Sequence, residues 1–310
     1  MSKKMRKMAI LAKLEVTYAL DPVPTGAANA LVVSDVEITP LDGEAVERNN
    51  IQPHFGNNGS IQATSFARIK FNIELAGSGA AGTAPGWSPV LRACAVSATV
   101  AAGVSVTYAP ISEALESVTI YGNVDGVNHV MPGVRGEAKL ALDAKGKPVI
   151  QCEFMGLWAP LTDTALPVPV YTGWTKPVAV NKANTTASLH GEVIAMQHFD
   201  LAFANQLVKR DLTGVDTVEI TDRKSAGSIV FENTAIATKD WVSAAKAMTL
   251  GDLEIVHGTV AGNIIEINAA ATCEISKPTY SNSDGVQMMN LQTRFIPTAD
   301  GNDEWSIVVR

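Results

Sequence analysis

The sequence is poor in charged side chains. Asp, Glu, Lys and Arg make up 18% of its 310 residues, against roughly 25% in an average soluble protein. Either partner subunits cover much of the surface, or loops of small residues replace charged ones. Basic residues are also in the minority: the net charge is −7, and residues 187–310 hold 16 acidic and 9 basic side chains. The sequence therefore lacks the basic patch that strong binding to nucleic acid requires.

Cysteine is also scarce. Cys94, Cys152 and Cys273 are far apart and form no CxxC pair, so the sequence predicts buried free thiols instead of a disulfide framework or a zinc site. The five histidines show no metal-ligand spacing, and no HExxH, GxSxG or P-loop motif is present. We therefore expect no catalytic, cofactor or metal site.

Long apolar runs are missing as well. The N-terminus, MSKKMRKMAILAKLEV, begins like a signal peptide, but its apolar run MAILA is shorter than the ~7–15 residues that export requires. No run approaches the ~18 residues of a membrane span. The sequence predicts a protein that folds in a cytoplasm and has no membrane partner.

Alternation of apolar and polar residues runs through most of the chain, for example in RIKFNIEL (68–75) and SVTIYGNV (117–124). This period is typical of β-strands. Two segments, 85–96 and 238–248, show helical spacing instead, and each opens on residues that favour helix starts. We predict a mainly β protein with two short helices.

These landmarks occur twice in the same order. Trp87 and Trp241 mark the two helices, and the pattern of 140–154 resembles that of 255–269. The first copy is longer by about 38 residues between its helix and this last hairpin. Only two copies are found, which indicates a duplication and not a repeat array.

The duplication predicts two tandem β-sandwich domains, each flanked by a short α-helix. The first domain would cover 1–165 and the second 189–310. Between them, 166–188 is rich in proline, threonine and small residues, as linkers are.

The segment Gly77–Gly82 matches the glycine pattern GxGxxG of dinucleotide-binding proteins. That site requires a helix that opens at the third glycine and an acidic residue ~20 positions later. Here 83–86 intervene, and no acidic residue occurs between Glu74 and Glu113. The pattern does not favour nucleotide binding.

The segment GSGAAGTAPGWSPVLRACAV (77–96) resembles tail tube proteins of long-tailed, siphovirus-like bacteriophages. The resemblance continues through YAPISEALESVTIY (108–121) and GVRGEAKLALDAKGKPVIQCEFMGLW (133–158). It implies a β-sandwich flanked by one helix, with an N-terminal arm and a long loop that reach neighbouring subunits. It also implies rings that stack into a tube around a channel for the genome.

The implied function is that of a structural virion protein of the tail, assembled in the host cytoplasm, and not of an enzyme. Two tube-type domains per chain would give a trimeric, pseudo-hexameric ring; with only one such domain, the ring would hold six chains. The implied partners are other copies of the chain and the tape measure, tail terminator and distal tail proteins. Double-stranded DNA would pass through without specific binding. The alternatives are a β-sandwich binding or decoration module, an enzyme, and a type VI secretion tube.

Candidate residues follow from these matches. We expect one set to pack the helices onto their sandwiches: Trp87, Leu91, Cys94, Trp241 and Ala245. The long loop 42–66 is the candidate for contact between rings, with Glu47, Arg48, Asn50, His54 and Phe55. Residues 1–12, basic and not expected to join a core, are the candidate arm, with Lys3, Lys4, Arg6 and Lys7.

Overall fold

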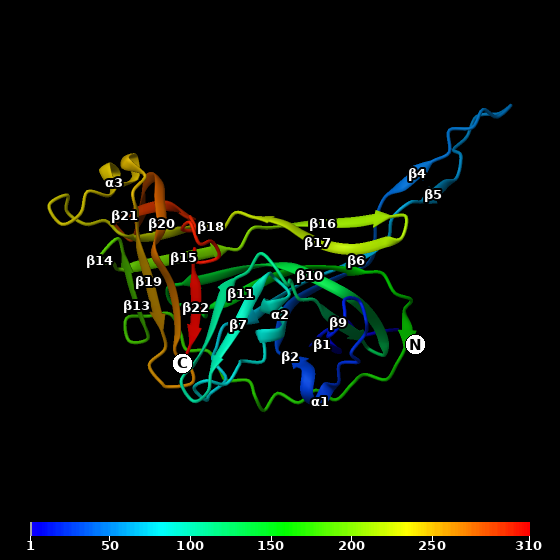
Figure 1. Cartoon of the computed structure of the whole chain (residues 1–310), viewed down its shortest axis with the longest axis horizontal. Coiled ribbons are helices and arrows are strands. Elements are labelled where there is room, and N and C mark those ends of the chain that lie inside the picture. The colour runs from blue at the N-terminus through cyan, green and yellow to red at the C-terminus, as the bar shows by residue number, and fades with distance from the viewer. Residues whose placement is uncertain (1) are drawn as a thin grey trace.

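The computed structural model describes residues 2–310, and it is mainly β, as the alternation predicted. Figure 1 shows an elongated body in which residues 2–165 and 189–310, here called the first and second halves, lie side by side. The first half contains β1 (Met8–Leu14), α1 (Gly26–Asn29), β2 (Ala30–Leu31), β3 (Val33–Asp42), β4 (Ala45–Glu47), β5 (Ser60–Gln62), β6 (Phe66–Glu74), α2 (Ser88–Arg92), β7 (Val96–Ala101), β8 (Ser105–Pro110), β9 (Val118–Val124), β10 (Val127–Asp143), β11 (Val149–Leu157) and β12 (Thr162–Asp163). Strand β13 (Thr185–Leu189) begins inside the segment 166–188 and leads into the second half, which continues with β14 (Glu192–Val193), β15 (Met196–Ala202), β16 (Asn205–Leu212), β17 (Val215–Arg223), β18 (Ala226–Glu232), α3 (Trp241–Ala247), β19 (Leu250–His257), β20 (Ile265–Ser283), β21 (Val286–Phe295) and β22 (Ser306–Val309).

Helices α2 and α3 lie inside the two segments with helical spacing. Pro89 stands in the first turn of α2, where its missing N–H costs no hydrogen bond. Asp240 caps α3 by accepting a hydrogen bond from the backbone N–H of Ser243, and Met248 ends that helix in the left-handed conformation. The third helix, α1, is a single turn that the sequence pattern did not predict.

The two halves repeat one pattern of strand pairing. In the first half β1 pairs with β9, β9 with β10, β10 with β11, β11 with β6, and β6 with β3. In the second half β13 pairs with β19, β19 with β20, β20 with β21, β21 with β18, and β18 with β15. Each half also places a hairpin at the same point, β4–β5 between β3 and β6 and β16–β17 between β15 and β18.

The structure corrects the alignment of the two copies by one strand. The sequence pattern aligned residues 140–154 with 255–269, and this alignment makes the hairpin β10–β11 correspond to β19–β20. The pairings instead equate β10–β11 with β20–β21. The extra segment of the first half is then the β7–β8 hairpin alone, because β9 and the first part of β10 have counterparts in β19 and β20. The shift arose because neighbouring strands share the same alternation.

One eight-stranded sheet runs through both halves. Its order is β3-β6-β11-β10-β15-β18-β21-β20, and the halves meet where Lys139–Asp143 of β10 pairs with His198–Ala202 of β15. A second junction joins β22 to β8. Large apolar side chains of both halves belong to one buried cluster.

Residues 166–184 pack along the body without helix or strand, and residues 185–188 of the predicted linker belong to β13. Trp174 donates from its indole N–H to the carbonyl of Ala30, and Val180 is 2% exposed. The proline-rich composition thus corresponds to an extended segment in contact with the rest of the chain.

Strand β1 differs from the expectation for residues 1–12. Ala9, Ile10, Leu11 and Ala12 are buried between β2 and β9, so the expectation that this segment stays outside the core is wrong for these residues. The run MAILA is long enough for a buried strand. None of the helices in residues 2–310 has the length and apolar character needed to cross a membrane.

Candidate assembly interface

The eight-stranded sheet ends on two edges that lack a partner within the described chain. Strand β3 pairs only with β6, and residues 276–283 of β20 pair only with β21. Edge strands expose unpaired N–H and C=O groups that can accept a strand of another chain. The two edges run in opposite directions, because each neighbouring pair between them is antiparallel.

Tyr280 marks the β20 edge. It pairs with Met289 of β21, a residue that is 2% exposed, so its ring lies on the core-facing side of the sheet. Nevertheless 58% of Tyr280 is exposed. Leu140, on the corresponding strand β10, is fully buried beneath the junction with β15. The β20 edge therefore exposes apolar surface that the junction inside the chain covers.

The other face of the sheet is polar, and three of its basic side chains lie beside carboxylates. Arg68 and Lys70 both contact Glu153, at 3.6 and 3.1 Å, and Lys139 lies 3.0 Å from Asp200. A basic side chain held in this way is less available to a phosphate. This face can contact a polyanion without binding it tightly.

His198 links the two halves on the same face. Its Nδ1 lies 2.6 Å from Asp143 on β10 and its Nε2 lies 3.2 Å from Asp200. The hydrogen bond with Asp200 raises the pKa of His198, and that with Asp143 adds to it. Burial alone would raise the pKa of Asp200, but hydrogen bonds from His198 and Lys139 outweigh it and lower that pKa to about 2.

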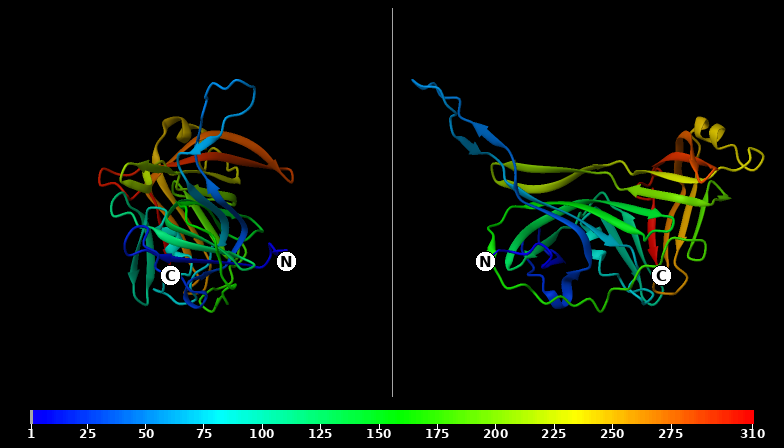
Figure 2. Two further views of the ribbon diagram at one scale, coloured as in Figure 1. Left: turned by 90° about the vertical axis from the view of Figure 1, so that its right-hand side faces the viewer. Right: turned by 180° about the vertical axis from the view of Figure 1, so that it is seen from behind.

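The β16–β17 hairpin lies across the first half. Figure 2 shows it running along the body over the sheet that contains β10 and β11. Val218 and Leu207 of the hairpin pack into an apolar cluster with Phe66, Met155 and Leu157 at the ends of β6 and β11. The second half therefore holds the first through more than the shared sheet.

Arg135 anchors this hairpin. It is 8% exposed and donates to the carbonyl of Val218 at 2.8 Å, to the carboxylate of Glu219, and to the carbonyl of Leu115 at 3.1 Å. Its guanidinium also lies 5.0 Å from the ring centre of Tyr18, and the hydroxyl of Tyr18 accepts a hydrogen bond from the Val218 N–H. A planar group with several donors suits such a site.

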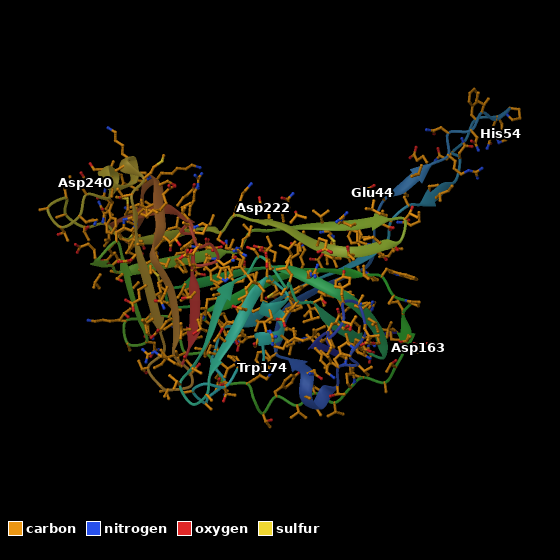
Figure 3. The ribbon with its side chains drawn as sticks, in the orientation of Figure 1. Glu44, His54, Asp163, Trp174, Asp222 and Asp240 are labelled. Carbon is orange, nitrogen blue, oxygen red and sulfur yellow. The ribbon has the colours of Figure 1, made fainter. Side chains whose placement is uncertain are left out.

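The β4–β5 hairpin has no such support. Figure 1 shows it leaving the body at the end of β3, and Figure 3 places His54 at its far end. Ile51 and Phe55 are completely exposed. The five candidate residues of the long loop all lie here and are exposed: Glu47, Arg48, Asn50, His54 and Phe55. A hairpin with exposed apolar residues and no intrachain partner is a surface for another molecule.

The residues expected at the helix packing sites are all buried, between 0% and 5% exposed: Trp87, Leu91, Cys94, Trp241 and Ala245. The indole of Trp87 donates to the carbonyl of Ala76 at 2.8 Å, and that of Trp241 donates to the Thr234 hydroxyl at 2.9 Å. Trp305 is a further core residue that was not predicted: it stacks on Phe203 with ring centres 4.4 Å apart and is 1% exposed. Its position one residue before a terminal alternating run was the available signal.

The basic N-terminal residues Lys3, Lys4, Arg6 and Lys7 are exposed. The amine of Lys3 donates to the carbonyl of Asp125, the backbone N–H of Lys4 donates to its carboxylate, and Lys7 lies 3.9 Å from that carboxylate. These contacts fix the start of β1 to the β9–β10 turn of the same chain.

The glycine-rich loop Gly77–Gly82 packs against the second half. The N–H of Gly79 donates to the carbonyl of Gly262 at 2.9 Å, and that of Gly77 donates to the side chain of Asn263. A Cβ atom on Gly77 would lie 2.0 Å from the Gly262 carbonyl oxygen. Close backbone approach, and not phosphate binding, explains the glycine at this position.

Reactive groups are scarce in residues 2–310. The three thiols are buried, and burial raises the pKa of Cys273 to about 12. No group of three metal-ligating side chains occurs in this part of the chain.

A family model described as phage tail tube protein matches residues 5–294. No curated protein sequence matches the chain.

Proposed function

Since the chain belongs to the phage tail tube protein family, we propose that three copies close into a ring and that such rings stack into the tail tube, the conduit for DNA ejection. The family establishes a structural role in the virion tail. The trimeric ring, the stacking and the passage of DNA are our proposal.

The observation that supports it best is the eight-stranded sheet with two free, oppositely directed edges. A heterologous contact between different surfaces closes into a ring when its rotation permits. Joining β20 of one chain to β3 of the next would remove every free edge of this sheet, as closure does in barrels. Because the pairing pattern occurs twice per chain, three chains would supply six similar units.

The polar face of the sheet suits the inner wall of such a tube. Its opposite face is buried against the core, so ring closure would leave the polar face toward the channel. Arg68, Lys70 and Lys139 are each held by a carboxylate there. DNA could then slide without being retained. The ends of the tube would meet the tape measure, tail terminator and distal tail proteins.

We further propose that the β4–β5 hairpin contacts a neighbouring chain. Its exposed Ile51 and Phe55 have no partner within the described chain. Deleting 46–62 removes this contact surface and leaves β3 and β6 intact. We expect the deletion variant to be folded, soluble and unable to polymerise.

Negative-stain electron microscopy and light scattering of the purified protein test the proposal. We expect tubes or stacked rings with a central channel, and a mass of three chains for a single ring. Rings of six whole chains would overturn the trimer. A protein that stays monomeric at high concentration, even with an initiator complex added, would favour a β-sandwich binding or decoration module.

A further inference from the structure

An apolar groove lies at one end of the second half, and no segment of residues 2–310 fills it. Its volume is about 860 Å³, within the range of pockets that take several side chains or a small ligand, roughly 300–1,000 Å³. Ala187, Ile194 and Met288 line it and are 4–6% exposed, so they form its floor. Val193 and Val286 also line it and are 81% and 45% exposed. The groove therefore presents apolar surface to a partner.

In the first half the corresponding strand is covered. Strand β2 pairs with β1 as β14 pairs with β13. Both residues of β2 are buried, and Trp174, in the extended segment 166–184, donates from its indole N–H to the carbonyl of Ala30. On β14, Val193 has no such cover. The comparison indicates the kind of occupant that suits the groove, namely a segment without regular structure that carries a large apolar side chain.

The groove and the β4–β5 hairpin lie at opposite ends of the eight-stranded sheet. Strand β6 begins at Phe66, which pairs with Asp42 where the hairpin leaves. It ends at Glu74, which pairs with Val149 beside the β10–β11 turn. That turn borders the groove together with the β20–β21 turn, which the antiparallel pairings place at the same end. Figure 1 accordingly shows β4–β5 and β14 at opposite ends of the molecule.

This arrangement gives the proposed ring two different rims. When the sheet edges of neighbouring chains are joined, the ends of the strands form the rims of the ring. The hairpin then projects from one rim, and the groove lies at the other. Residues 43–65 connect β3 to β6, so each arm of the hairpin can extend at most roughly 35 Å. Rings stacked in one orientation bring the hairpin of one ring to the groove end of the next, a heterologous contact that continues along a filament.

The tip of the hairpin has a composition that suits the groove. Residues 49–63 contain no Asp, Glu, Lys or Arg, and Ile51 and Phe55 within them are completely exposed. The groove has no excess of one charge that would select a charged ligand, since its ionisable lining residues are two basic and two acidic ones: Lys145, Lys182, Glu232 and Asp284. Removing apolar surface of both partners from water would drive the contact.

We propose that the tip of the β4–β5 hairpin, with Ile51 and Phe55, docks into this groove on a chain of the adjacent ring. The tip then covers Val193 of β14, as the segment with Trp174 covers β2 in the first half. The groove is thereby assigned as the surface that receives the hairpin. This inference rests on the proposed stacking of rings, and each ring of three chains would make three such contacts with the next.

Crosslinking of assembled protein tests the contact directly. The test chain carries Phe55→Cys and Val193→Cys, and a short bismaleimide joins thiols that lie close together. The matched control carries Phe55→Cys and Val168→Cys, because Val168 is 82% exposed, like Val193, but does not line the groove. All three positions are exposed, so the substitutions leave the core intact. The native cysteines are buried, and the unmodified chain and the single-cysteine chains measure the background.

We expect the test chain to give a ladder of covalent products that extends well beyond three chains, because each link joins one ring to the next along the tube. The control chain should give no ladder. Products that end at three chains would place the contact within a ring and would overturn the inference. Tubes that form without any crosslinked product from the test chain would also overturn it and would leave the proposed tube intact.

A charge placed in the groove tests the same contact through assembly. Val193→Asp should raise the protein concentration needed for tubes at least about tenfold, since it opposes the burial of one large apolar side chain. Single rings of three chains should remain. Val168→Asp, the matched control, should assemble as the unmodified chain does. Equal concentrations for Val193→Asp and Val168→Asp would overturn the inference. Absence of rings and tubes in the unmodified chain would instead overturn the proposed function, and the inference with it.

Discussion

Replacing Arg135 by Met should loosen the β16–β17 hairpin from the first half. The guanidinium is nearly buried and bonds to the carbonyls of Val218 and Leu115 and to the carboxylate of Glu219. Methionine keeps most of the aliphatic stem, so packing is largely retained. The loss is then that of a buried charge pair with one partner removed, typically about 3–5 kcal/mol. Because Glu219 is one-third exposed and can be rehydrated, we expect a value near the lower end, about 3 kcal/mol.

Denaturant unfolding of the purified chain measures this difference in the free energy of unfolding. Hydrogen exchange locates it: amides of β16 and β17 should exchange faster in Arg135→Met, while those of β18 stay protected. Arg135→Lys is the matched control, because it keeps the charge and loses the fork of donors; we expect an intermediate loss. A loss below about 1 kcal/mol in Arg135→Met, the size of an exposed ion pair, with unchanged exchange in the hairpin, would refute the view that Arg135 anchors it.

Three further predictions concern the core and the junction between the halves. Trp305→Ala removes a buried ring stacked on Phe203 and should lower the free energy of unfolding by about 3–5 kcal/mol in the same assay; a loss below about 1 kcal/mol would contradict its core role. Gly77→Val places a side chain against the carbonyl of Gly262 and should lower the melting temperature, whereas Gly173→Val, in open space, should not. The pKa of His198 is raised in the folded chain. Its protonated form therefore stabilises the fold fully below its ordinary pKa near 6.5, and this contribution is lost as pH rises through the folded pKa. The pKa of Asp200 is lowered to about 2, so its ionised form stabilises the fold above about 3.8 and loses this effect only as pH falls toward 2. The melting temperature of His198→Gln should therefore fall less than that of the unmodified chain between about pH 6 and about pH 8, and equal slopes would contradict the reasoning.

Local chemistry made some elements predictable. The helices α2 and α3 were predicted because Pro89 and Asp240 are helix-start residues, and those signals act within a few positions of the chain. The alternation likewise predicted the mainly β class. In contrast, MAILA was predicted to belong to an exposed arm. A short apolar run flanked by lysines can be exposed or can form a buried strand, and only its tertiary contacts decide between the two.

Which strands are neighbours could not be read from the sequence. Alternation says which residues share a face but not which strand pairs with which, so the duplication was aligned one strand out of register. The free edges of β3 and β20 could not be predicted either, because a strand is an edge only when the pairing of every other strand in the sheet is known. The long loop 42–66 was visible as a composition, but its shape as a projecting hairpin became evident only beside the docked β16–β17.

The junction of β22 with β8 has one more consequence. Ile307 pairs with Tyr108, so the C-terminal strand fastens the second half to a hairpin that only the first half possesses. Together with the shared sheet, this second attachment fixes the angle between the halves in each free chain. In a ring of such chains, the curvature of half of the wall would be set during folding, before any two subunits meet. Assembly would then determine only the angles between neighbouring chains. A ring with a different number of chains could close only if each folded chain were bent away from the angle between its halves.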